Sequence, residues 1–507
     1  MTTDTFTTTI SGDEARRAAR NAGAIAAASI LSRGLQFGWQ LLLVSALGPA
    51  MYGIYGVVAA FIMVGSAIPN FGMGPIVVRD VARYPQKAGQ YLTATLFMQT
   101  VLALLAYVGL NAAAALGGYS ETVRVFVSIA SLGLIVDILG SMCNDLLLAQ
   151  ERMLASSVVT VCHILLMIVL AALGLAGGYG LFGLYLGSLI AGVGRSTALW
   201  LLVLRGGVRP QWPFDRSIAG PLISNGAPLA VAAFLSLAYQ QADKLLTNRL
   251  IGDVETGYLS VAFIFIFGIV ELLSTTILLA TFPLMSRAHG DGRNPLFGFI
   301  VGKLSFFTVL VSLPICLTLS VYAAEITVPL FGEDFRPTAD VLRILIWYAL
   351  ISMFNNIPAQ GMTVQNRQRR TLFIRAGGLT LNVILLLTLL PVLGVRGAAV
   401  ASVGAEALVL VLLLRSFHAE GWDTRQLLPR LLRLAALGAG VALLLLALRG
   451  GVPTLGMIVG MVAYGVGVLV FKILAPDDWD LLYRLVAAMP GGALVLKYWR
   501  RDVKLNW

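Results

Sequence analysis

Charged residues are scarce in this chain. Only 12% of its 507 residues are Asp, Glu, Lys or Arg, whereas a soluble domain carries about 25%. Cysteine and histidine are scarcer still, with three of each. Cys143, Cys162 and Cys316 lie singly in apolar runs without a CxxC pair, so the sequence predicts neither a disulfide scaffold nor a metal site.

Motifs of soluble enzymes are missing as well. GFIVGKL does not form a phosphate-binding P-loop, because its spacing is wrong and Leu304 stands where Ser or Thr is needed. There is no HExxH, no nucleophile elbow and no cluster of His and Cys. The loops between apolar segments are too short to hold a catalytic domain. We therefore predict a protein that is not an enzyme and that uses no cofactor.

Apolar sequence is abundant. Hydrophobic residues make up 58% of the chain, and the mean hydropathy is +0.85. Segments of about 20 apolar residues, enough for a helix to cross a bilayer, recur from end to end. We predict an all-α polytopic membrane protein with about 14 transmembrane helices, arranged as two pseudo-symmetric six-helix bundles plus a C-terminal helix pair.

The expected parts follow from the spacing of these segments. They are a cytoplasmic N-terminal tail (1–22), an N-terminal six-helix bundle (23–204), a cytoplasmic linker (205–219), a C-terminal six-helix bundle (220–417), a final transmembrane helix pair (418–474) and a cytoplasmic basic tail (475–507).

Positive charge alternates between successive loops. One set of loops is rich in arginine, as in RGGVRPQWPFDR at 205–216, and the other set holds few cations. Because cytoplasmic loops carry an excess of Lys and Arg, the pattern predicts an even number of spans with both termini in the cytoplasm. The bilayer thus accounts for the formal net charge of +11, and we predict no nucleic-acid partner.

One glycine-bearing turn occurs twice. LGPAMYGIYGVVAAF at 47–61 and IGDVETGYLSVAF at 251–263 each interrupt a long apolar run, and Gly48 and Gly53 align with Gly252 and Gly257. Two copies of one helical unit explain the repetition. With an even number of helices each, the copies insert the same way up, as parallel repeats with a cavity between them. Close helix packing is predicted at three glycine pairs: Gly34/Gly38, Gly183/Gly187 and Gly456/Gly460.

Further motifs follow in a fixed order. They are GPIVVRD after the first turn, QQADKLLTNRLIG with the GY that follows it, LFGEDFRPTADVLRIL, and LLPVLGVRGAAVASVGAE. Together with LGPAMYGIY, they resemble the polysaccharide flippase family, the oligosaccharidyl-lipid and O-antigen transporters. This family belongs to the superfamily that also holds multidrug-extrusion and lipid II flippases. The resemblance covers nearly the whole chain.

The resemblance implies a flippase without ATPase machinery, working by alternating access in the bacterial cytoplasmic (inner) membrane. Its substrate would be an isoprenoid-diphosphate-linked oligosaccharide, moved from the cytoplasmic to the outer leaflet for lipopolysaccharide or exopolysaccharide biosynthesis. The expected partners are this glycan and membrane lipid, with a polysaccharide polymerase or glycosyltransferases as candidate protein partners. The alternative is a cation-coupled multidrug or small-molecule exporter of the same superfamily. A third class is a scaffold without transport, which would tolerate neutralisation of its buried charges.

Polar residues at matching positions of the two copies are candidates for the substrate site. Gln36 aligns with Gln240, and Gln40 aligns with Lys244. Ionisable groups inside spans are costly and face a cavity or a partner. The cations would bind the diphosphate of the implied substrate, because the planar guanidinium of arginine can bind two phosphate oxygens. The glutamines and the tyrosine would hydrogen-bond to its sugar hydroxyls. The candidate substrate-binding residues are Arg33, Gln36, Gln40, Arg195, Tyr239, Gln240 and Lys244.

Acidic residues inside the spans are candidates for proton or ion coupling: Asp137, Asp145, Asp243, Glu271 and Glu406. Structural roles are equally open. Asp243 could form an ion pair with a neighbouring cation, and Asp137 and Asp145 belong to a polar stripe that could hydrogen-bond between helices. Arg195 could instead extend to the cytoplasmic face.

Overall fold

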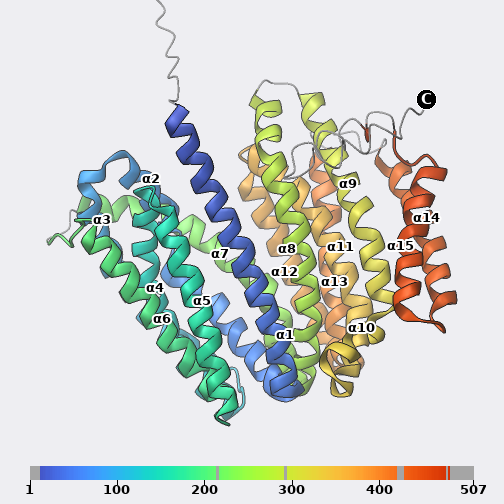
Figure 1. The fold of residues 1–507 in the computed structure, drawn as a ribbon, viewed down its shortest axis with the longest axis horizontal. Helices are drawn as coiled ribbons and strands as arrows, with labels where there is room; N and C mark the ends of the chain where they lie inside the picture. Colours follow the sequence, from blue (N-terminus) through green and yellow to red (C-terminus); the bar gives the residue numbers. More distant parts are fainter. Residues whose placement is uncertain (1–11, 213–215, 291–293, 419–426, 476–477, 480–507) are drawn as a thin grey trace, which may run out of the picture. The chain divides into compact units, whose positions relative to one another are not determined.

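The computed structural model describes residues 12–212, 216–290, 294–418, 427–475 and 478–479 (Figure 1). Over this part of the chain all regular structure is helical, and no strand occurs. Thirteen of the helices there are long and apolar enough to cross a membrane. The predicted all-α polytopic class is therefore confirmed.

The first half of the chain forms these helices: α1 (Gly12–Asn70), α2 (Met73–Arg83), η1 (Pro85–Lys87), α3 (Ala88–Leu116), α4 (Glu121–Ala149), α5 (Met153–Ala176), α6 (Gly180–Arg205) and α7 (Arg216–Ile251). The second half forms α8 (Asp253–Gly290), α9 (Asn294–Val321), α10 (Ala323–Phe331), η2 (Glu333–Phe335), α11 (Arg336–Val364), α12 (Gln368–Leu393), α13 (Val395–His418), α14 (Leu427–Leu448) and α15 (Pro453–Val470).

The 59 residues of α1 contain two of the expected spans. Gly48 interrupts the helix with φ 68° and ψ 174°, a backbone conformation that residues with a side chain rarely adopt. A bilayer needs only about 20 helical residues, so the segments on either side of Gly48 are each long enough to cross it. With α1 counted as two spans, the thirteen helices agree with the fourteen predicted spans.

The chain divides into two compact units. The first draws on Met1–Ile264, Thr327–Val341 and Arg375–Ala405, and the second on Phe265–Ile326, Leu342–Ile374 and Glu406–Trp507. These units are defined by contacts between residues. The division into bundles at 23–204 and 220–417 is one by spans, and it stays a prediction.

In the first unit, α4, α5 and α6 run side by side (Figure 1). The short helix α2 packs mainly against α4 and α7 and buries Met73, Ile76, Val77 and Val81. Each of these four residues lies three or four positions from another of them in sequence, which places them on one face of the helix. Their core includes Met142, Leu146, Leu199 and Val203 from α4 and α6, with Ile218 and Leu222 from α7. The sequence pattern did not predict α2, because only one face of this short helix is apolar and it forms no long apolar segment.

In the second unit, α14 and α15 pack against each other and against α9 (Figure 1). The Tyr464 hydroxyl donates to the Leu310 carbonyl at 3.0 Å, and the Tyr322 hydroxyl to the Leu445 carbonyl at 3.3 Å. The predicted close packing at Gly456 is confirmed, because a Cβ there would stand 2.0 Å from the Tyr322 hydroxyl oxygen. The final helix pair is thus bonded to α9 through backbone carbonyls.

Three ion pairs fix this pair of helices at its ends. Arg449, just after α14, donates to Glu325 of α10 at 2.8 Å. Burial raises the pKa of the Glu325 carboxyl, but the bonds with Arg449 outweigh burial, and the pKa lies below its ordinary value. Beyond α15, the fully buried Asp478 pairs with Lys303 of α9 and with Arg430 of α14.

We predict that Asp478→Ala strongly destabilises the protein. The change would leave the buried Lys303 ammonium without its carboxylate, and breaking a buried ion pair in this way costs about 3–5 kcal/mol. Thermal unfolding of the detergent-purified protein measures the effect. The control is Glu333→Ala, because Glu333 and its partner Arg336 are both exposed; equal losses in the two variants would contradict a special role for Asp478.

Candidate functional site

One buried carboxylate joins three helices of the first unit. Asn382 of α12 donates from Nδ2 to Asp243 Oδ1 of α7 at 2.9 Å, and Ser402 of α13 bonds the same carboxyl group. All three side chains are buried. The amide oxygen of Asn382, Oδ1, has no hydrogen-bond partner among the described residues. A carboxylate beside an amide oxygen is the ligand type that protons and hard cations take.

The second unit contains a similar pair. Asn355 of α11 donates from Nδ2 to Glu406 of α13, to the backbone carbonyl at 3.0 Å and to Oε1 at 2.9 Å. Both side chains are fully buried, and Asn355 Oδ1 likewise has no hydrogen-bond partner within the described part of the chain. Two of the acidic residues singled out from the sequence are therefore held by asparagines. Among the residues searched, no group of three or more His, Cys, Asp or Glu side chains could hold a metal ion.

Lys244 lies next to Asp243 on α7. Its ammonium stands 5.6 Å from the centre of the Phe263 ring of α8, a cation–π distance. Lys244 and Gln240 are half-buried, whereas Tyr239 is buried. Sequence reasoning missed Gln241, which is 1% exposed and has neither amide atom hydrogen-bonded in the described residues. Unsatisfied polar atoms of this kind are costly inside a protein.

The polar candidate residues of α1 that precede Gly48 are not buried. Arg33 and Gln36 are exposed and Gln40 is half-buried. The predicted close packing at Gly34 and Gly38 does not occur among the described residues, because none of their atoms lies within 4 Å of the place where a Cβ would stand at either glycine. The glycine pattern does not distinguish a packed helix face from an open one. Gly183 and Gly187 do pack closely, against Gly174 and Leu170 of α5.

Arg195 and Asp137 form an ion pair inside the first unit. Arg195 Nη1 of α6 donates to Asp137 Oδ1 of α4 at 2.9 Å. On the same helices, the Ser196 hydroxyl donates to the Val136 carbonyl and the Trp200 indole to the Leu139 carbonyl. His163 of α5 contacts the Ala191 carbonyl of α6 through Nδ1 at 3.1 Å. The pair therefore stands at a helix interface that several other hydrogen bonds hold together.

The remaining acidic candidates have separate surroundings. Asp145 of α4 lies against Gly74 in the first turn of α2, where a Cβ would stand 2.9 Å from Oδ2. A helix N-terminus favours a negative charge. Asn144 next to it accepts a hydrogen bond from Ser156 of α5, in line with the structural interpretation of this stripe. The side chain of Glu271 lies outside the described residues.

The two repeated turns meet backbone to backbone within the first unit. A Cβ on Gly53 would stand 1.8 Å from the Asp253 carbonyl oxygen, and one on Gly257 would stand 2.0 Å from the Pro49 carbonyl oxygen. Each copy thus presses a glycine against the backbone of the other, which only glycine allows at this separation. Between α3 and α4, the Tyr119 hydroxyl donates to the Leu245 carbonyl of α7 at 3.1 Å.

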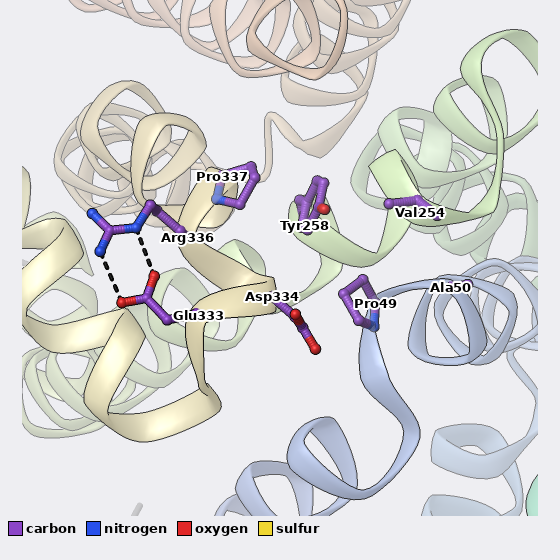
Figure 2. A pocket seen from close by; sticks show the side chains of 8 residues that line it. All are labelled: Pro49, Ala50, Val254, Tyr258, Glu333, Asp334, Arg336 and Pro337. Atoms are coloured by element: carbon purple, nitrogen blue, oxygen red, sulfur yellow. Dashed lines mark hydrogen bonds and ion pairs between the residues drawn. The ribbon is translucent and has the colours of Figure 1, made fainter.

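A shallow pocket opens beside this contact (Figure 2). It is lined by both turns and by the η2–α11 junction: Pro49, Ala50, Val254, Tyr258, Glu333, Asp334, Arg336 and Pro337. Glu333 and Arg336 bond each other through both oxygens, at 2.7 and 2.8 Å. None of the predicted substrate residues lines this pocket. It is a hollow at the ends of helices and not the candidate site inside the spans.

We predict that Gly257→Ala destabilises this arrangement of the two turns. The added methyl group would overlap the Pro49 carbonyl, and overpacking of this kind costs about 1–3 kcal/mol. Gly34→Ala is the matched control, because its methyl group would meet no atom of the described residues. Thermal unfolding should show a loss for Gly257→Ala alone, and an unchanged melting temperature for that variant would refute the tight contact.

The fold is that of a multi-pass, all-α membrane protein. The structure of lipid II flippase MurJ in an inward closed conformation is 12% identical, with a TM-score of 0.74 over 88% of this chain and 98% of that one. An inward-facing multidrug resistance MATE family transporter of the MOP superfamily is 16% identical, with a TM-score of 0.62 over 78% and 96%. A MOP superfamily transporter from Pyrococcus furiosus is 17% identical, with a TM-score of 0.54 over 78% and 95%. At these identities, the likenesses show the fold alone.

The family comes from the sequence itself. The family described as "Polysaccharide biosynthesis protein" matches residues 42–340, more than half of the chain. The chain belongs to this family. No curated protein sequence matches it.

Proposed function

We propose that this protein is a flippase that moves an isoprenoid-diphosphate-linked oligosaccharide from the cytoplasmic to the outer leaflet by alternating access. One observation carries the proposal: two cations lie inside candidate membrane spans of a protein that belongs to a polysaccharide-biosynthesis family. Arg33 on α1 is exposed and Lys244 on α7 is half-buried. Both positions lie within apolar helices, where a charge is costly without a purpose.

In this proposal the cations bind the diphosphate. Arg33 offers a planar fork that suits two phosphate oxygens, and Lys244 acts as a point charge. Gln36, Gln40 and Gln240 supply amide groups for sugar hydroxyls, and Tyr239 adds a hydroxyl once the site opens around it. The isoprenoid tail stays in lipid. Loop charges support a bacterial inner-membrane orientation with both termini in the cytoplasm.

The membrane potential is sufficient to drive the movement. An inside-negative potential favours outward movement of an anion by about 2.3 kcal/mol per charge per 100 mV. A diphosphate with about two charges therefore gains roughly 5 kcal/mol per 100 mV if no other ion moves. No nucleotide-hydrolysing motif is needed, and none occurs in the sequence.

Ion or proton exchange is the second source of energy within this proposal. Asp243 with Asn382 and Ser402 offers a buried carboxylate with an adjacent unpartnered amide oxygen. Glu406 with Asn355 offers the same combination. A proton or cation bound there would change the bonds between helices, as alternating access requires.

The second candidate function is a cation-coupled exporter of drugs or other small molecules. The fold likeness to MATE transporters favours it, since it extends over 78% of the chain. Such an exporter would carry cationic amphipaths in a cavity of net negative charge. Arg33 and Lys244 oppose this polarity.

We predict that Arg33→Ala and Lys244→Ala each abolish most translocation of a fluorescent polyprenyl-diphosphate oligosaccharide in proteoliposomes. The loss of a charge-assisted bond to phosphate weakens binding about tenfold or more. Arg396→Ala is the control, because Arg396 pairs with Asp340 at the start of α13. If both test variants translocate as fast as the wild type, the cationic site is wrong. If the wild type is inactive while an ion gradient drives export of a cationic dye, the exporter replaces the flippase.

We predict that Asp243→Asn removes the response of transport to an imposed pH or sodium gradient. The amide keeps the size of the side chain and its bond to a neighbour, but it cannot release a proton or carry the charge that attracts a cation. The measurement compares translocation with and without each gradient. A gradient response of wild-type size in this variant would exclude Asp243 from coupling.

A further inference from the structure

Three ionisable side chains meet at one depth inside the first unit. Arg195 lies ten residues before the end of α6, His163 lies ten residues after the start of α5, and Asp137 lies twelve before the end of α4. At about 1.5 Å per residue, all three stand roughly 15–18 Å from the same ends of their helices. His163 is near enough for the charges of the other two to act on it.

These side chains lie away from several exposed apolar residues of their own helices. Asp137 is five residues from the exposed Leu132, which turns it about 140° round α4. His163 stands at the same angle from the exposed Val158 on α5, and Arg195 stands about 160° from the exposed Val193 on α6. The exposed apolar residues Leu132, Val158 and Val193 thus lie on other sides of these helices than the charged groups do.

The ion pair is open on the side of Asp137. The Asp137 side chain is 56% exposed and that of Arg195 is 18% exposed. A carboxylate is costly in hydrocarbon, which favours water over lipid at this exposed face of α4. The bond engages one nitrogen of the Arg195 guanidinium and one carboxylate oxygen. A one-pronged exposed pair is weak, whereas a guanidinium holds phosphate oxygens with two prongs.

We propose that Arg195 is a diphosphate-binding side chain and that Asp137 occupies the ligand's place as a resident counter-ion. The substrate's diphosphate displaces the carboxylate and takes both prongs of the guanidinium. His163 stands on the third side of the site and adds a ring nitrogen to it. Asp137 keeps Arg195 compensated between cycles and weakens the binding of substrate, which favours its release. The inference rests on the proposed function, because it needs a diphosphate substrate.

The experiment measures binding of farnesyl diphosphate to the purified full-length protein, with farnesol as the ligand that lacks phosphate. Asp137→Asn removes the competing charge and should bind farnesyl diphosphate several-fold more tightly than the wild type does. Arg195→Gln should bind it about tenfold more weakly. Asp340→Asn, which breaks the pair with Arg396 at the other end of the helices, should bind as the wild type does. A gain in affinity cannot come from misfolding, so Asp137→Asn is informative even if Arg195→Gln folds poorly.

The double variant Asp137→Arg with Arg195→Asp separates binding from structure. It restores an ion pair between α4 and α6 but moves the cation to α4. Weak binding together with a wild-type melting temperature supports the inference. Wild-type binding in Asp137→Asn, Arg195→Gln and the double variant shows a structural pair and overturns the inference alone. If the wild type does not distinguish farnesyl diphosphate from farnesol, the proposed function fails together with the inference.

Discussion

A charge in hydrocarbon is expensive, and this constraint accounts for the interior of the protein. Four of the ionisable residues inside the candidate spans have specific partners among the described residues. Asp243 and Glu406 are held by asparagines, Asp137 by an arginine, and Lys244 lies over an aromatic ring. Each arrangement joins different helices. The polar interior therefore determines which helices stay together, while the apolar exterior only keeps them in the membrane.

Backbone polar groups are also costly in hydrocarbon when they are not hydrogen-bonded. Irregular backbone in lipid would leave peptide groups unsatisfied. Where α1 breaks at Gly48, the following turn packs against its repeat-related copy through Gly53 and Gly257. The protein thus places its tightest backbone contact at a helix break. The proposed substrate site, on α1, α4, α6 and α7, is separate from this contact.

Much of the fold could be read from the sequence, because long apolar segments and loop charges are one-dimensional signals. The repeat of Gly48 and Gly53 at Gly252 and Gly257 also identified the two turns that meet in space. The helix α2 and the open face at Gly34 and Gly38 could not be read in this way. An amphipathic helix of eleven residues gives no apolar span, and small residues occur on both packed and open faces.

The site was harder to predict than the fold. Asp243, Asp137 and Glu406 could be singled out from the sequence because they are charged residues inside apolar segments. Their partners, however, lie 139, 58 and 51 residues away in the chain. Which face of one helix meets which face of another depends on packing angles that no local pattern records. Sequence reasoning missed Asn382 and Gln241 as site residues because a single amide in a span carries no charge. An amide next to a buried carboxylate becomes recognisable only in three dimensions.

The central claim is that a diphosphate-linked glycan crosses the membrane through this protein as an anion. The most direct measurement is the rate of translocation of a fluorescent polyprenyl-diphosphate oligosaccharide by the wild-type protein in proteoliposomes, as a function of an imposed membrane potential. The account predicts that an inside-negative potential accelerates movement to the outer leaflet and that the reversed potential slows it. Translocation at one rate under both potentials, with no ion gradient present, would contradict the account.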